Sequence, residues 1–223
     1  MSAAKFRVVG SDYVGAFATA SDGHAFVGSE LGPKARSIIA ENLGVDVTGL
    51  TIFGSGLVGM LARANSNGII MSNLIDDREL DALKSAGLGI NIGVIESGLN
   101  AVGNNVLAND RIAIVNPDYD AASEAVIRDT LGVEVVKAAI GGFKTVGANN
   151  ILTNRGIVIN NRSTDEDQER VDSLVGMKSV RSTANTGFLS IGIAAVSNSN
   201  GMVVGEATTG YEMARIMDGL GID

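Results

Sequence analysis

The sequence predicts an α/β protein built from five repeated units, arranged as a closed, pseudosymmetric five-bladed α/β propeller with helices on the outside. Three sets of recurring residues predict this fold class. The dipeptide Val-Gly, once Ile-Gly, returns at intervals of 44, 44, 44 and 45 residues, with its glycine at Gly15, Gly59, Gly103, Gly147 and Gly192. Turn residues keep a similar interval at Gly23, Gly68, Arg111, Gly156 and Gly201. Glycines that close amphipathic stretches follow at Gly44, Gly87, Gly132, Gly176 and Gly219.

The elements of one unit are clearest in the second. LTIF at 50–53 is a short apolar strand that ends at Gly54, and the segments MLARAN and IIMS flank the turn SNG, which indicates a hairpin. An amphipathic helix comes next, because Asp76 and Glu79 have the spacing of a capping box and Gly87 suits a left-handed C-terminal cap. We expect the glycine-bearing strands to lie near the axis of the propeller.

The other units repeat this order. The expected helices cover residues 29–43, 75–86, 118–131, 163–175 and 208–218. Ser163 with Glu166, and Thr209 with Glu212, offer the same capping pair at two of the helix starts. In units one to four the helix is followed by an apolar segment that predicts another strand: VDVTGLTIF, INIGVIES, VEVVKAAI and MKSVRSTA.

The fifth unit lacks this last strand, and the N-terminus carries a surplus one. FRVVGS at 6–11 aligns with LTIFGS at 50–55 at an offset of 44 residues. We therefore expect the N-terminal strand to complete the last blade, which favours a closed ring because an open stack would expose strand edges. The chain should be a single domain, 1–223, with repeats at approximately 5–48, 49–92, 93–136, 137–181 and 182–223.

Composition limits both the core and the possible chemistry. The chain is 45% hydrophobic but only 4% aromatic and contains 29 glycines, so the core should consist of small and branched aliphatic side chains. The absence of cysteine excludes disulfides, thiolate metal sites and cysteine nucleophiles. The sequence shows no signal peptide and no apolar stretch of about 18 residues, which predicts a soluble, cytoplasmic protein without membrane contact. A net charge of -8 argues against binding to free nucleic acid.

One motif imitates a dinucleotide-binding fingerprint. Gly54, Gly56 and Gly59 form GxGxxG after a strand, with Asp76 and Asp77 roughly 20 residues on. The fingerprint requires a helix whose N-terminus faces the pyrophosphate, whereas a hairpin pattern follows here. The repeat explains the glycines better, and no cofactor is expected.

Catalytic and metal-binding constellations are also disfavoured. His24 is the only histidine and is expected at an exposed turn, where it has no partners for metal binding or base catalysis. The acidic groups Asp76/Asp77, Asp118/Asp120 and 165–167 lie in the first turns of helices, where carboxylates favour the helix dipole. Neither a metal site nor an enzyme is predicted.

Two sets of asparagines recur at equivalent positions of the units. Asn104 and Asn105, and Asn149 and Asn150, come after Val-Gly in neighbouring units and should gather at one face of the ring. These amides either hydrogen-bond the ends of strands or bind a partner, and both interpretations stay open. The asparagines of the hairpin turns should instead support backbone geometry: Asn65, Asn109, Asn154 and Asn198.

Four segments resemble the translation initiation factor 6 family, the ribosome anti-association factors of archaea and eukaryotes. They are SGLVGMLARANSNGIIM, LNAVGNNVLANDRIAIVNPD, KTVGANNILTNRGIVIN and STANTGFLSIGIAAVSNSNGMVVGEATTGYE. The likeness extends over essentially the whole chain, and unit one is its most divergent part. Because the chain ends with its fifth helix, the C-terminal tail of the eukaryotic members is not expected and the archaeal form is the nearer match.

The resemblance implies a pentein ring that binds the large ribosomal subunit near the sarcin-ricin loop, largely through ribosomal proteins, with rRNA as a further contact. It implies a monomer that blocks joining of the small subunit by steric occupancy, and a role in biogenesis of the large subunit. By position after the Val-Gly turns, it implicates five residues in ribosome binding: Met60, Asn104, Asn105, Asn149 and Ile193. Met60 and Ile193 could equally belong to the core.

Two other functions are weighed against this one. Penteins include guanidino-modifying enzymes that use a cysteine nucleophile with histidine and carboxylate partners, and that chemistry lacks its nucleophile in this chain. A ring-shaped scaffold for another protein complex is the third hypothesis, because a fold alone does not fix a function.

Overall fold

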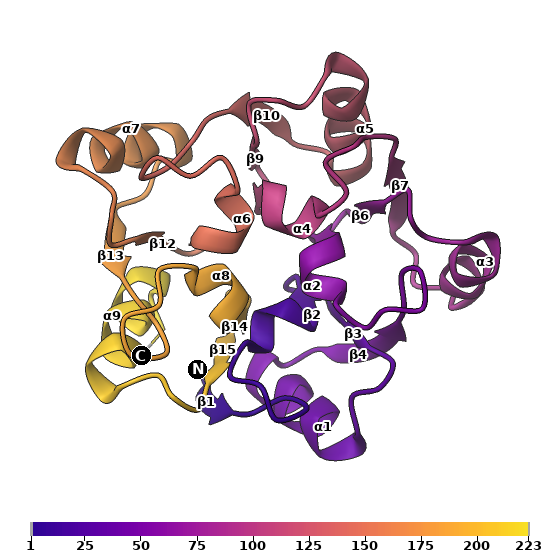
Figure 1. Cartoon of the computed structure of the whole chain (residues 1–223), viewed down its shortest axis with the longest axis horizontal. Helices are drawn as coiled ribbons and strands as arrows, with labels where there is room; N and C mark the ends of the chain where they lie inside the picture. Colours follow the sequence, from indigo (N-terminus) through magenta and orange to yellow (C-terminus); the bar gives the residue numbers. More distant parts are fainter. Residues whose placement is uncertain (1, 223) are drawn as a thin grey trace.

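The computed structural model describes residues 2–222, and across these residues five three-stranded sheets alternate with helices (Figure 1). The first four sheets follow the chain: β2 (Ala18–Ala20), β3 (His24–Gly28) and β4 (Asp46–Leu50); β5 (Ala62–Ala64), β6 (Gly68–Ser72) and β7 (Asn91–Ile95); β8 (Val106–Ala108), β9 (Ile112–Val115) and β10 (Glu134–Lys137); β11 (Ile151–Leu152), β12 (Ile157–Asn160) and β13 (Ser179–Ser182). The fifth sheet joins β14 (Ala195–Ser197) and β15 (Gly201–Gly205) to β1 (Ser2–Phe6).

Every sheet has the same topology. An antiparallel hairpin supplies the first two strands, and a third strand pairs in parallel with the second one. In the first four sheets the third strand follows a long helix, which provides the crossover that a parallel pair needs. In the fifth sheet this position is taken by β1, which runs parallel to β15 from Ser2 opposite Gly201 to Phe6 opposite Gly205.

The long helices lie at the periphery in Figure 1. They are α1 (Pro33–Leu43), α3 (Asp77–Ser85), α5 (Ala121–Leu131), α7 (Asp165–Val175) and α9 (Gly210–Leu220). The capping boxes predicted at Asp76/Glu79 and Thr209/Glu212 are confirmed. The box of α7 is shifted by one residue from Ser163/Glu166, because the Thr164 hydroxyl and the Asp167 carboxylate make the two reciprocal bonds. The left-handed cap of α9 is Gly221, and Gly219 lies inside the helix.

Short helices occupy the middle of the molecule in Figure 1, where the sequence suggested glycine-bearing strands. They are η1 (Val14–Ala16), α2 (Val58–Leu61), α4 (Val102–Asn105), α6 (Val146–Asn149) and α8 (Ile191–Ala194). Each contains the glycine of the recurring dipeptide, so the expectation of strands there was wrong.

Close backbone contact explains the recurring glycine. A Cβ atom on Gly59 would collide with the carbonyl oxygen of Gly15, one on Gly103 with that of Gly59, and one on Gly147 with that of Gly103. The series continues from Gly192 to Gly147, and from Gly15 to Gly192. Since the obstacle is backbone in every case, no side-chain movement could make room for a larger residue.

The hairpin turns share one hydrogen-bond pattern that fixes their register. The N–H of Ser21, Asn65, Asn109, Thr153 and Asn198 donates to the carbonyl of the residue three positions on. The equivalent positions are therefore His24, Gly68, Ile112, Gly156 and Gly201, and the predicted Gly23 and Arg111 each lie one residue early. His24 is accordingly the half-buried first residue of β3 and not an exposed turn residue.

Asparagine side chains join neighbouring units at these turns. The Oδ1 atoms of Asn65, Asn109 and Asn198 accept N–H groups of their own turns, as predicted. Their Nδ2 atoms donate to carbonyls of the following unit: Asn65 to Asn109 and Leu131, Asn109 to Thr153, and Asn198 to Ser21 and Leu43. Asn154 differs, because its Nδ2 donates to the carboxylates of Asp22 and Asp110.

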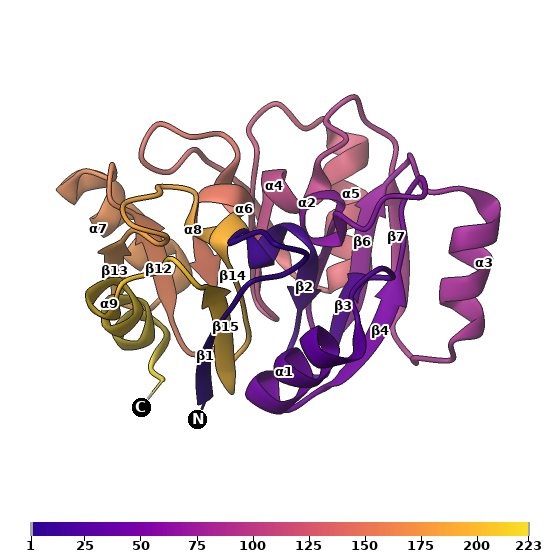
Figure 2. The ribbon, with the colours of Figure 1, turned by 60° about the horizontal axis from the view of Figure 1, so that its bottom comes forward.

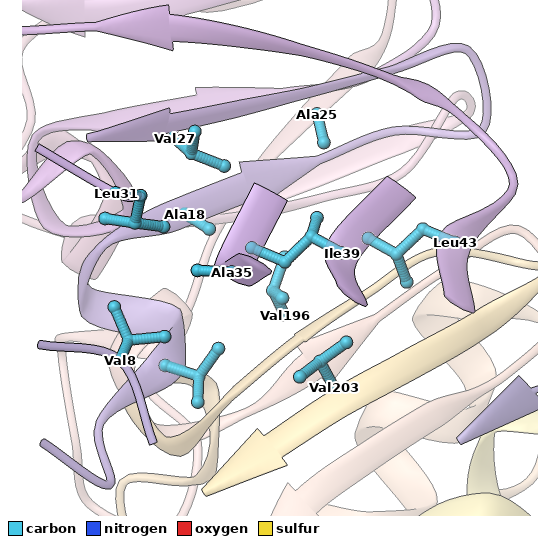
Figure 3. Close-up of a cluster of buried hydrophobic side chains, with 11 residues drawn as sticks. Val8, Ala18, Ala25, Val27, Leu31, Ala35, Ile39, Leu43, Val196 and Val203 are labelled. Carbon is cyan, nitrogen blue, oxygen red and sulfur yellow. The ribbon is translucent and has the colours of Figure 1, made fainter. Parts of the chain in front are cut away.

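Hydrophobic clusters lie between consecutive sheets. Figure 3 shows one of them, in which Ile39 and Leu43 of α1 lie near Val196 of β14 and Val203 of β15, so α1 packs on the fifth sheet. Helices α5 and α9 pack in the same way on β6–β7 and on β12–β13. The buried side chains are mostly Ala, Val, Ile and Leu, as the composition predicted.

Candidate functional site

The candidate site is the face of the molecule that carries the five short helices, here called the corner face. Figure 2 shows α2, α4, α6 and α8 near the same end of the strands. The residues that follow the recurring glycine mark this face: Ala16, Met60, Asn104, Ala148 and Ile193. Three of these five residues, Ala16, Met60 and Ile193, line one depression.

Met60 and Ile193 line an apolar groove of about 410 Å³. The other walls come from units one, two and five: Ser11, Tyr13, Ala16, Phe17, Leu57 and Phe188. The rings of Tyr13 and Phe188 lie 5.0 Å apart between centroids at a tilt of 46°. Met60 and Ile193 are half-buried, so the groove presents their side chains at the surface.

Two exposed apolar residues sit in the turns that lead into the groove residues. Val9 is 67% exposed with a φ of 50°, and Phe53 is 75% exposed with a φ of 57°. A positive φ is unfavourable for bulky side chains, above all β-branched ones, so the surrounding structure must hold both turns in place. At Phe53 that restraint is visible, since the N–H groups of Phe53 and Gly54 each donate to the Glu79 carboxylate over 2.8 Å.

Glu79 remains charged and so holds the turn at Phe53 in its strained conformation. Burial raises the pKa of Glu79, but hydrogen bonds from the Thr51 side chain and the N–H groups it accepts outweigh that and lower the pKa below its ordinary value. Glu79 thus stays ionised at neutral pH and accepts the N–H groups of Phe53 and Gly54. Exposed, ordered apolar residues of this kind are typical of protein-binding surfaces.

The asparagines of the corner face divide into buried and accessible positions. Asn105 is buried, donates from Nδ2 to the carbonyl of Ala101 over 2.9 Å, and accepts from Asn116 over 2.7 Å. Asn149 repeats this arrangement, with Thr145 as the carbonyl partner at 2.9 Å and Ser190 as the donor at 2.8 Å.

Asn150 is also buried and donates to the carbonyl of Val146, whereas Asn104 is half-buried at the surface. Three of the four amides therefore bond the protein's own backbone, which is the structural alternative that the sequence left open. Of the five predicted site residues, Met60, Ile193 and Asn104 are accessible at the corner face.

Beneath the short helices, one arginine bonds the backbone near the centre of the molecule. Arg63 donates from Nε to the carbonyl of Val106 over 3.0 Å and from Nη2 to that of Gly103 over 2.7 Å. Burial lowers the pKa of Arg63 to about 10, so the guanidinium remains charged at neutral pH. It binds carbonyls of the third unit from a strand of the second one.

The glycines of the apparent nucleotide motif are explained by packing. A Cβ atom on Gly56 would collide with the Glu30 carboxylate, and one on Gly59 with backbone of unit one. The short helix α2 contains Gly59 and is only four residues long, from Val58 to Leu61. Close packing against Glu30 and unit one therefore accounts for Gly56 and Gly59.

Residues 2–222 contain no group of three or more His, Cys, Asp or Glu side chains placed to hold a metal ion. Within the same span no helix has the length and apolar character needed to cross a membrane. His24 stacks on Phe26 with 6.2 Å between ring centroids.

Comparison with known proteins points to one family. Residues 3–219 match the model of the eIF-6 family. Translation initiation factor 6 of Methanopyrus kandleri is 38% identical over 146 residues, which cover 66% of this chain and 65% of that protein. The factor of Aeropyrum pernix is 34% identical over 145 residues, covering 64% and 62%, and that of Natronomonas pharaonis is 38% identical over 138 residues, covering 62% of each. These alignments span somewhat less than two thirds of the relatives' length.

Proposed function

The chain belongs to the eIF-6 family, and on that basis we propose that it binds the large ribosomal subunit and prevents premature association with the small one. The family consists of translation initiation factors and not of enzymes. The proposed mechanism is steric: the protein covers a surface that the small subunit would otherwise contact, and no bond is made or broken.

The observation that carries this proposal, beside the family match, is the apolar groove of the corner face. A groove of about 410 Å³ edged by Tyr13, Leu57 and Phe188 offers the aromatic and aliphatic anchors that dominate binding energy at protein interfaces. Ribosomal proteins near the sarcin-ricin loop are the proposed partners, with rRNA at the margin.

We assign the five implicated residues different parts in this interface. Met60 and Ile193 would contact the partner from the groove, and Asn104 from the third unit. Asn105 and Asn149 would act by holding the short helices α4 and α6 rigid, since their amides already bond the backbone four residues earlier. A rigid corner avoids the entropic cost of ordering a loop on binding.

The proposal includes the overall architecture. The five repeats, at approximately 5–48, 49–92, 93–136, 137–181 and 182–223, are proposed to form one closed pentein ring that acts as a monomer in the cytoplasm. The β1–β15 pairing and the contact of Gly15 with Gly192 support closure. A further role in biogenesis of the large subunit is consistent with the same binding site.

The charge of the chain suits the proposed partner. A net charge of -8 complements the basic extensions that ribosomal proteins present, so association should be fast and weakened by salt. Binding to free RNA should be poor for the same reason.

Co-sedimentation with purified large and small subunits tests the proposal. We expect selective binding to the large subunit and reduced subunit joining in light scattering. Met60→Asp and Ile193→Asp should each weaken binding by about thirtyfold or more, the loss typical of an interface hot spot of about 2 kcal/mol. Asn104→Tyr should weaken binding by steric conflict.

Ser173→Tyr on the exposed side of α7 serves as the control for bulk and should leave binding unchanged. Equal binding to both subunits, or undiminished joining at saturation, would refute the function. Normal binding by all three corner-face variants would refute the assigned surface and leave the function standing.

A further inference from the structure

A second groove, of about 660 Å³, lies over the outer strand of the fourth sheet between α7 and α9. Its volume falls in the range of sites for small organic ligands. In contrast to the corner face, its lining is polar: Asn161, Gln168, Ser179, Arg181, Ser182, Thr183, Tyr211, Glu212 and Arg215, with Val180 as the apolar member.

The repeat shows that the fold does not require polar groups here. The residue six positions before the left-handed cap glycine is Ile38 in α1 (before Gly44) and Val126 in α5 (before Gly132), but Arg170 in α7 (before Gly176) and Arg215 in α9 (before Gly221). Ile38 packs into one hydrophobic cluster with Phe6 at the end of β1, and Val126 into another with Ile95 at the end of β7. At the corresponding end of β13 the residue is Ser182.

Between units four and five, a serine and an arginine therefore stand where α1 and α5 make an apolar contact. Arg170 of α7 is also an arginine, but its Nη2 donates to the carbonyl of Ala139 and to the Asp167 carboxylate. Arg215 instead places its guanidinium in the wall of the groove.

A second guanidinium in the groove has unused bonding capacity. The Arg181 side chain is 27% exposed, and its Nε is buried without a hydrogen-bond partner among the described residues. Its Nη2 pairs with Asp165, whose side chain is 91% exposed. Exposed ion pairs contribute little, so an anionic ligand could displace Asp165 at small cost.

Arg215 is also only partly engaged. Its Nη2 donates to the carbonyl of Arg181 over 3.2 Å, and its Nη1 lies 3.8 Å from the Asp218 carboxylate. These contacts bring the Arg215 guanidinium to the edge of β13 that carries Arg181.

The carboxylate inside the groove bonds groups other than the two arginines. Glu212 accepts hydrogen bonds from the Thr183 hydroxyl and from the N–H groups of Gly187 and Thr209, each at 2.8 Å. These bonds engage both carboxylate oxygens and hold Glu212 at the start of α9.

We propose that this groove binds a nucleoside phosphate, either free or as one unit of a single-stranded RNA. Arg181 and Arg215 bind the phosphate, because guanidinium groups match its oxygens with paired donors. Tyr211, which is 77% exposed at the groove, stacks on the base. The Asn161 amide and the Gln168 Oε1, whose Nε2 is used by the carbonyl of Ser179, bond the edge of the base.

The overall charge of the protein restricts the ligand to a short one. A net charge of -8 repels a long polyanion, so we expect the site to contact a short ligand through its phosphate at Arg181 and Arg215. The site is independent of the corner face, and ribosome binding neither supports nor opposes it.

The test uses the full chain and four probes: adenosine monophosphate, a six-nucleotide single-stranded oligoadenylate, adenosine, and inorganic phosphate. Amide chemical shifts followed during titration should change around Arg181 and Tyr211 with both nucleotide probes. Adenosine monophosphate should bind at least tenfold more tightly than either adenosine or phosphate. A tighter hexamer would identify an RNA unit as the ligand, and equal affinities would identify a free nucleotide.

Arg181→Gln and Arg215→Gln should each weaken nucleotide binding about tenfold or more, and Tyr211→Ala should abolish the advantage over inorganic phosphate. Arg36→Gln on α1 is the matched control, because Arg36 also donates to backbone carbonyls but lies away from the groove. Absence of shifts around the groove in the unaltered protein at millimolar nucleotide would overturn the proposal without any variant. Affinities unchanged in both groove arginine variants would overturn it equally.

Discussion

Replacing Gly103 with alanine tests why a glycine recurs in the short helices. The added Cβ would lie 2.5 Å from the carbonyl oxygen of Ala62 and closer still to that of Gly59. Ordinary contacts of this kind are about 3.5 Å, so the backbone of the second unit would have to move by about 1 Å or more. Overpacking of a rigid interior costs about 3 kcal/mol.

Helix propensity acts in the opposite direction and sets the net value. Gly103 lies in α4 without a positive φ, so alanine should favour the local helix by about 1 kcal/mol. We therefore expect Gly103→Ala to lower the free energy of unfolding by about 2 kcal/mol, measured by urea denaturation followed by circular dichroism.

The matched control is Gly210→Ala at the start of α9, where a new Cβ would meet no atom within 4 Å. That change should be neutral or slightly stabilising. If Gly103→Ala were as stable as Gly210→Ala, close backbone contact could not be the reason for the 44-residue spacing.

Two further predictions concern buried charges. Burial raises the pKa of Glu212, but hydrogen bonds from Thr209, Gly187 and Thr183 outweigh this and lower the pKa from 4.5 to about 2. The ionised carboxylate should therefore stabilise the fold by about 3 kcal/mol above pH 4.5. This contribution should be lost as the pH falls towards 2. Urea denaturation of Glu212→Gln should differ from that of the parent chain by this amount at pH 7 and scarcely at pH 2; an equal difference at both would disprove the linkage. Arg63→Met should lower the free energy of unfolding by about 3 kcal/mol, because the carbonyls of Gly103 and Val106 lose their donor. Unaltered thermal and urea stability would show that Arg63 is dispensable.

The periodic part of the fold could be predicted from the sequence. Helix starts at Asp76/Glu79 and Thr209/Glu212 follow from local capping chemistry, which depends on residues three apart. The start of α7 was displaced by one residue because Ser163 and Thr164 are both able to cap, and the geometry of Asp167 decides between them.

The short helices could not be predicted in this way. Four residues such as Val102–Asn105 are too few for a helical period to appear, and their conformation depends on carbonyls of the preceding unit. Whether Asn105 and Asn149 bond the protein's own backbone or a partner also depends on these short helices. Asn105 and Asn149 turn inward because the helical geometry brings the carbonyl four residues earlier within reach.

The walls of the apolar groove were missed for a related reason. Tyr13 and Phe188 come from units at opposite ends of the chain, and their ring contact exists only because those units are neighbours in space. An aromatic residue shortly before the recurring glycine in units one and five was the available signal.

The pairing of β1 with β15 has a consequence for the order of events during synthesis. Ser2 leaves the ribosome well before its partner Gly201, which is made about 200 residues later. At about 5–20 residues per second, β1 must wait tens of seconds, or about ten at the fastest, with its backbone donors and acceptors open to water or to foreign strands. Strand β1 is therefore made before β15 but can pair only after β15 is made. A nascent chain stalled before β15 would present an unpaired edge that chaperones or aggregating neighbours could capture.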